Sequence, residues 1–155
     1  MRRLLLAFVF APLLALQAAS DVVFEHVWPQ YRDAQSFDRI RTYFGGSADE
    51  SRQTVLRSQA ESYDGLFFLV RVKSPRPLNA ARFILEIIRP DSPDAKRYTF
   101  TASLPAKSHV AELGLTGTDW AGGPDVHPVA WKVTLLDANG EVLASQPSFL
   151  WEKPA

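Results

Sequence analysis

The sequence predicts a mainly β protein, an antiparallel β-sandwich of about eight strands with one short helix near its N-terminus. Three observations predict this fold. Most of the chain alternates apolar and polar residues with a period of two, as half-buried strands do. Turn-forming residues separate these segments at intervals of roughly 8–15 residues. The chain shows no internal repeat and no alternation of strands with long helices, which disfavours solenoid and βαβ folds.

The first 19 residues stand apart from this pattern. Residues 1–3 are short and basic, residues 4–16 are an uncharged apolar stretch, and small residues follow. This order is typical of a secretory signal peptide, with cleavage expected after Ala18 or Ala19. The alternative is a retained membrane anchor. Thirteen apolar residues, however, reach only about 20 Å as a helix, against a hydrocarbon core of about 30 Å.

We therefore expect residues 1–19 to be a signal peptide and residues 20–155 a single β-sandwich domain, periplasmic or secreted, with no membrane span after cleavage. Without Arg2 and Arg3, 15 basic residues remain against 17 acidic ones, a net charge of −2. Such a balance gives no electrostatic basis for binding nucleic acid or an anionic membrane. The chain has no cysteine, which excludes disulfides, thiolate metal sites and cysteine nucleophiles.

The strands begin after the leader. Residues 21–28 alternate, and Pro29 is expected to end that strand. Residues 36–44 instead place Phe37, Ile40 and Phe44 on one side of a helix, with Ser36 as its expected N-cap. A helix this short is marginal alone, so its apolar stripe must pack on another element.

The middle of the chain returns to a period of two. Residues 53–59 and 66–73 are expected to be strands, with a turn at Asp64-Gly65 between them. Residues 82–89 are so apolar that they predict a central strand with both faces largely covered. Residues 96–103 and 109–115 complete this set.

The last two strands are predicted at residues 129–136 and 141–151, with a hairpin turn at residues 137–140. Residues 130–145 resemble the last hairpin of immunoglobulin-like and fibronectin-type-III-like domains, in which an aromatic and alternating aliphatics lead into a D-x-x-G turn. This resemblance implies the β-sandwich fold and nothing about chemistry. The absence of the Cys…Trp…Cys spacing excludes an antibody-type domain.

Catalytic and metal-binding patterns are weak throughout the sequence. His26, His109 and His127 are far apart, and none lies in a metal-ligand spacing. The chain has no G-x-S-x-G or S-x-x-K motif for a serine nucleophile and no phosphate-binding glycine loop. We therefore predict no catalytic residue, no metal and no cofactor. A small hydrolase whose site is assembled only by the fold is kept as a minor alternative.

The Gly/Pro-rich loop at residues 116–128 is the best candidate for a ligand site. It holds Trp120, and a loop tryptophan either docks on the core or is presented to a ligand. The candidate ligand-binding residues are Asp119, Trp120, Asp125 and His127. Plugging the end of the sandwich is the alternative role of Trp120.

These features lead us to expect an exported, non-catalytic binding module that interacts with a protein partner or a glycan in the cell envelope. The alternative is a carbohydrate-binding module that uses its loop aromatics as a platform. If the rings of Trp28 and Trp120 are exposed, the carbohydrate-binding hypothesis is favoured. An apolar surface patch or a free sheet edge would instead favour a protein partner.

Overall fold

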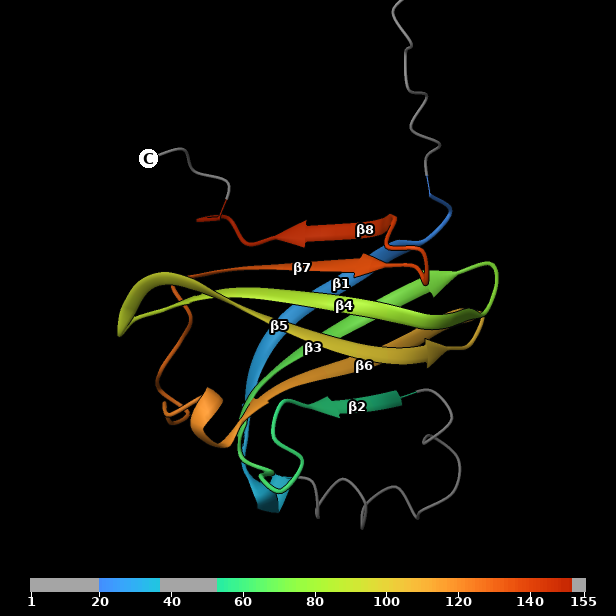
Figure 1. The fold of residues 1–155 in the computed structure, drawn as a ribbon. Coiled ribbons are helices and arrows are strands. Elements are labelled where there is room, and N and C mark those ends of the chain that lie inside the picture. Colours follow the sequence, from blue (N-terminus) through green and yellow to red (C-terminus); the bar gives the residue numbers. More distant parts are fainter. Residues whose placement is uncertain (1–19, 37–52, 152–155) are drawn as a thin grey trace, which may run out of the picture.

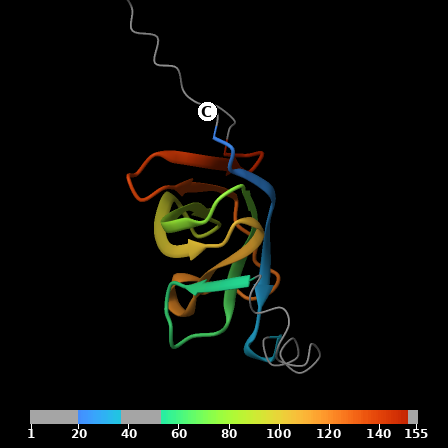
Figure 2. The same ribbon diagram turned by 90° about the vertical axis from the view of Figure 1, so that its right-hand side faces the viewer.

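Two four-stranded β-sheets face each other across a shared apolar core (Figures 1 and 2). The computed structural model describes residues 20–36 and 53–151. Sheet A consists, in spatial order, of β1 (Val23–Arg32), β3 (Gly65–Ser74), β6 (Lys107–Thr116) and β2 (Gln53–Arg57). Sheet B consists of β5 (Ser92–Leu104), β4 (Leu78–Arg89), β7 (Ala130–Leu136) and β8 (Val142–Pro147). This arrangement confirms the predicted β-sandwich.

The core forms because alternate side chains of both sheets point inward. The inward-facing aliphatic and phenyl side chains of the two central strands of each sheet are almost entirely buried; they include Leu66, Phe68, Val70, Val72, Phe83, Leu85, Ile87, Leu113, Leu115, Val133 and Leu135. Trp131 of β7 packs edge-on against Phe68 of β3 with the ring centroids 5.5 Å apart, which ties the two sheets together. Each such side chain contributes about 1.5–3 kcal/mol when fully buried.

The outer face of sheet B is polar. Glu86 of β4 accepts hydrogen bonds from Arg97 of β5 at 3.0 Å and pairs with Lys132 of β7 at 3.2 Å. Burial pushes the pKa of Glu86 upward, but the hydrogen bonds from both cations outweigh it and hold that pKa below its usual value. β4 is a central strand, as predicted for residues 82–89, but its outer face is only partly covered. Ile84 and Glu86 face outward and are only half-buried.

The outer face of sheet A holds a buried ion pair. Arg32 at the end of β1 donates to Glu112 of β6, whose side chain is 2% exposed. The same guanidinium lies 6.0 Å from the ring centroid of Phe67, which is fully buried on this face. Burial raises the pKa of Glu112, and the Arg32 charge opposes that rise without cancelling it.

The turn predicted at Asp64-Gly65 does not join β2 and β3 into a hairpin. β2 does not pair with β3, the next strand in the chain; it lies parallel to β6, with Leu56 opposite Leu113. A two-residue turn joins only antiparallel strands, so Asp64-Gly65 serves as a connection at the sheet end and closes no hairpin. The carboxyl ends of β2 and β6 consequently lie side by side, at the left-hand end of Figure 1.

The start of the chain differs from prediction in two details. Pro29 does not end the first strand, because β1 is an edge strand and tolerates a residue without an amide donor. Helical structure begins at Ala34, ahead of the predicted start. Asp33 is the N-cap in place of Ser36, and its carboxylate accepts the Ser36 backbone N–H at 2.8 Å. The remainder of the predicted helix, with Phe37, Ile40 and Phe44, lies outside the described residues.

The final hairpin confirms the sequence signal. The Asp137 carboxylate accepts the backbone N–H groups of Asn139 and Glu141 at 2.8 and 2.9 Å, and Gly140 adopts a φ of +85°. β8 then ends at Pro147, four residues before the predicted end of that strand. Within residues 20–36 and 53–151, no helix has the length and apolar character that a membrane crossing requires.

Candidate functional site

Connecting segments from four parts of the chain gather at one end of the sandwich. They follow β1, β2, β4 and β6, and the last of them begins with the short 3-10 turn η2 (Gly117–Asp119), seen at the lower left of Figure 1. The opposite end carries the connection from β3 in one sheet to β4 in the other, and the hairpin between β7 and β8. The predicted loop at residues 116–128 therefore meets three other segments.

A hydrogen-bonded clasp fixes η2 in place. The hydroxyl of Thr116 accepts the Gln59 N–H at 3.1 Å and donates to the Gln59 carbonyl at 2.8 Å, and Thr116 is fully buried. The Gln59 side-chain amide continues the clasp by donating to the Thr118 hydroxyl. Gly117 has a φ of +58°, and a Cβ there would come within 2.3 Å of the Gln59 side chain. Segments that follow the parallel strands β2 and β6 thus position the residue after η2, which is Trp120.

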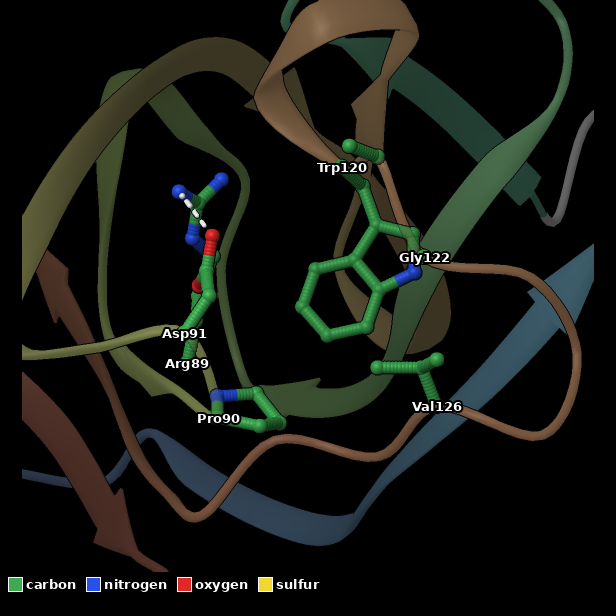
Figure 3. Close-up of a pocket in the computed structure, with 7 residues that line it drawn as sticks. Arg89, Pro90, Asp91, Trp120, Gly122 and Val126 are labelled. Atoms are coloured by element: carbon green, nitrogen blue, oxygen red, sulfur yellow. Dashed lines mark hydrogen bonds and ion pairs between the residues drawn. The ribbon is translucent and has the colours of Figure 1, made fainter.

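Trp120 is 5% exposed and packs into the apolar core. It forms one wall of a cavity of about 210 Å³, called here the Trp120 cavity (Figure 3). The cavity is lined by Arg89, Pro90, Asp91, Trp120, Ala121, Gly122 and Val126. In Figure 3 the indole ring lies between the Arg89–Asp91 turn on one side and Gly122 and Val126 on the other.

Two polar groups of the Trp120 cavity are buried without a hydrogen-bond partner in the part of the chain that the structure describes. They are Nε1 of Trp120 and Nε of Arg89. The other guanidinium nitrogens of Arg89 are engaged, one with the Asp119 carbonyl at 3.3 Å and one with the Asp91 carboxylate at 3.0 Å. Buried indole and guanidinium N–H groups normally find acceptors, so the wall of this cavity holds two unsatisfied donors, both with almost no accessible surface.

Gly122 lies directly against the indole N–H. A Cβ added at Gly122 would lie 3.1 Å from Nε1 of Trp120 and 2.7 Å from Cβ of Val126. Figure 3 shows the indole nitrogen on the side of the ring that faces this glycine. The neighbouring Gly123, by contrast, would place a Cβ in open space. Only the first of the two consecutive glycines therefore shapes the cavity.

Trp120 also borders a second, more polar hollow of about 360 Å³. This acidic hollow is lined by Tyr31, Ala34, Glu61, Ser62, Tyr63, Asp64, Gly117 and Trp120. The Asp64 carboxylate accepts the N–H of Ala34, and the Arg57 guanidinium stacks on the Tyr63 ring at 4.2 Å. Burial raises the pKa of Tyr31, and the nearby charges of Asp64 and Asp33 raise it further. The lining carboxylates make this hollow suited to a cationic group.

The four residues predicted from the loop fall in different places. Trp120 lines both hollows, and Asp119 joins the site through its backbone carbonyl. Asp125 and His127 are exposed and do not line the Trp120 cavity, although Val126 between them does. The predicted end-plugging role of Trp120 is consistent with its burial, and a ring so covered cannot act as a flat platform for a sugar.

The histidines remain apart in the fold. His26 lies on the edge strand β1, where its ring centroid is 4.6 Å from that of Trp28 with the two rings tilted by 45°, and His127 is exposed in the loop. His109 is buried in β6, and its Nε2 shares a hydrogen bond of 2.8 Å with the Thr54 hydroxyl. Among the residues that the structure describes, no group of three His, Asp or Glu side chains could hold a metal ion.

Sequence reasoning missed Arg89, Pro90 and the acidic turn around Glu61. A signal for them did exist, since antiparallel alternation brings the turn after β4 to the same end of the sandwich as the turn after β6.

In comparisons with known proteins, no family model matches the chain and no curated protein matches it significantly.

Proposed function

We propose that this protein is a non-catalytic binding module that holds its ligand in the Trp120 cavity. The observation that supports this most directly is the Trp120 indole N–H, which is buried without an acceptor among the described residues. Leaving such a donor unpaired costs about 1–3 kcal/mol. A ligand that displaces Gly122 from the indole N–H and brings an acceptor recovers that cost on binding, so the site favours occupancy.

The leader places this binding in an exported protein, with the periplasm or the outside of the cell as its location. The partner is then a protein or a glycan of the cell envelope. The buried position of Trp120 favours a ligand that inserts one group into the cavity. It disfavours a sugar ring that would stack on a broad aromatic surface.

A fragment screen on the mature chain tests the proposed site. The sequence has four tryptophans, so nitrogen-15 spectra contain a small set of indole N–H signals, and Trp120→Phe identifies the one from Trp120. The screen uses small amides, carboxylates, amines and monosaccharides. Gly122→Val fills the cavity, and Gly123→Val, where the added side chain meets open space, is the matched control.

We expect at least one fragment class to shift the Trp120 signal in the wild type and in Gly123→Val but not in Gly122→Val. Ala121→Trp, a substitution at an exposed residue of the cavity wall, should block the same fragments if Gly122→Val folds poorly. Fragments that bind all variants equally, or that never move the Trp120 signal, contradict the proposed site.

A further inference from the structure

We infer that the natural ligand is an extended polypeptide segment in which a short aliphatic residue is followed or preceded by lysine or arginine. The aliphatic side chain and a neighbouring peptide carbonyl occupy the Trp120 cavity, and the basic side chain lies in the acidic hollow. This inference rests on the proposed function, because it names the ligand of that same site.

The size of the Trp120 cavity indicates a ligand that enters only in part. Sites that enclose a whole drug-sized ligand measure about 300–1,000 Å³, whereas this cavity measures about 210 Å³. Its walls include Pro90, Ala121 and Val126, which match a short aliphatic group. The acceptor required by Trp120 Nε1 is supplied by a peptide carbonyl, which every residue of an extended segment carries.

The charges around the site disfavour an anionic acceptor. Among the described residues that line the two hollows, Arg89 is the one basic side chain, and the carboxylate of Asp91 already pairs with it at 3.0 Å. Arg57 adds a second positive charge beside the acidic hollow, where it stacks on Tyr63. Glu61 and Asp64 add two further carboxylates in the acidic hollow. A free carboxylate would therefore enter a region with an excess of negative charge, whereas the neutral carbonyl of an amide would not.

The same charges select the neighbouring residue of the ligand. Trp120 borders both hollows, so a chain anchored in the cavity continues past the indole toward Glu61 and Tyr63. The Glu61 and Asp64 carboxylates attract an ammonium or guanidinium group, while the Tyr63 ring already carries the Arg57 guanidinium at 4.2 Å. The unpaired indole N–H marks the anchor point, and the acidic hollow sets the charge of the residue beside it.

Capped tetrapeptides test this ligand class on the full mature chain. The probe contains glycine, valine, lysine and glycine in that order, with an acetylated N-terminus and an amidated C-terminus. A second peptide has glutamate in place of lysine, and a third ligand, N-acetylvaline, ends in a carboxylate. Binding is followed by the indole N–H signal of Trp120, in the wild type, in Gly122→Val and in Glu61→Lys. Glu141→Lys, with the same charge change at the opposite end of the sandwich, is the matched control.

We expect the lysine peptide to shift the Trp120 signal and to bind about tenfold more tightly than the glutamate peptide. Glu61→Lys should weaken the lysine peptide severalfold, and Glu141→Lys should leave it unchanged. Equal binding of the two peptides, or tighter binding of N-acetylvaline, overturns the ligand class while the fragment results still support the site. If neither peptides nor fragments distinguish Gly122→Val from the wild type, the ligand class and the proposed function are both wrong.

Discussion

The unpaired indole N–H of Trp120 makes an unusual prediction about stability. Replacing a buried tryptophan by phenylalanine normally destabilises a protein, because the smaller ring leaves a void. At Trp120 the same substitution also removes a buried donor that has no acceptor among the described residues. We expect Trp120→Phe to leave the free energy of unfolding within about 1 kcal/mol of the wild type.

The magnitude follows from two opposing terms. Truncating a buried tryptophan to alanine costs about 3–5 kcal/mol, and phenylalanine retains roughly half of that packing, which leaves a loss of about 1.5–2.5 kcal/mol. Removing an unsatisfied buried donor returns about 1–3 kcal/mol. The two terms nearly cancel at Trp120, which is 5% exposed. Trp120→Ala removes the same donor but also the whole ring, so the return of about 1–3 kcal/mol offsets only part of the packing loss of about 3–5 kcal/mol, and a net loss of about 2 kcal/mol is expected.

Urea unfolding of residues 20–155 measures these differences at constant slope. Trp131→Phe is the control, because Trp131 packs edge-on against Phe68 and its indole nitrogen is not among the unpaired buried groups. A loss above about 2 kcal/mol for Trp120→Phe would show that the indole N–H has a partner in solution. The indole N–H would then not be an unsatisfied donor available to a ligand.

Three other residues give predictions of their own. Burial lowers the pKa of His109, so below pH 6.5 the unfolded chain binds a proton that the folded chain does not. The free energy of unfolding should therefore fall as the pH drops below 6.5, by at most about 1.4 kcal/mol per pH unit. His109→Gln should flatten that decline in unfolding curves measured between pH 7 and 5. Thr116→Val leaves the Gln59 carbonyl and N–H without their partner and should cost about 1–3 kcal/mol in urea unfolding, whereas an unchanged midpoint would show that the clasp does not hold η2. Glu112→Ala removes the carboxylate that accepts from the Arg32 guanidinium and should cost about 3–5 kcal/mol, and a neutral effect in the same assay would contradict the burial of that pair.

The two-sheet fold was predictable because each half-buried strand shows its alternation in the sequence. Phe68 and Val70 of β3 and Leu85 of β4 are apolar at every second position, and the structure buries them. The Asp137–Gly140 turn was predictable for a similar local reason, since aspartate and glycine at these positions favour a tight reversal.

Pairing partners were not predictable from such local signals. Nothing in residues 53–57 distinguishes a strand that pairs with β3 from one that lies parallel to β6, because either neighbour accepts the same alternation. The prediction that Pro29 ends the first strand failed for a related reason. Proline is compatible with a strand only at a sheet edge, and the edge position of β1 is a tertiary property.

The candidate site was partly predictable. The position of Trp120 in a Gly/Pro-rich loop predicted its place in the site. The cavity beside it also depends on Arg89 and Pro90, which lie some 30 residues earlier in the chain. The role of Gly122 depends on its distance to Trp120 and Val126, which only the folded chain defines.

The most direct measurement of the central claim is a crystal structure of the mature protein with the capped valine-lysine peptide. We predict that a peptide carbonyl oxygen lies about 2.7–3.2 Å from Nε1 of Trp120, with the valine side chain against Pro90 and Val126. A peptide bound elsewhere, or a Trp120 indole that donates to a group of the protein itself with the peptide absent from the cavity, would contradict the account.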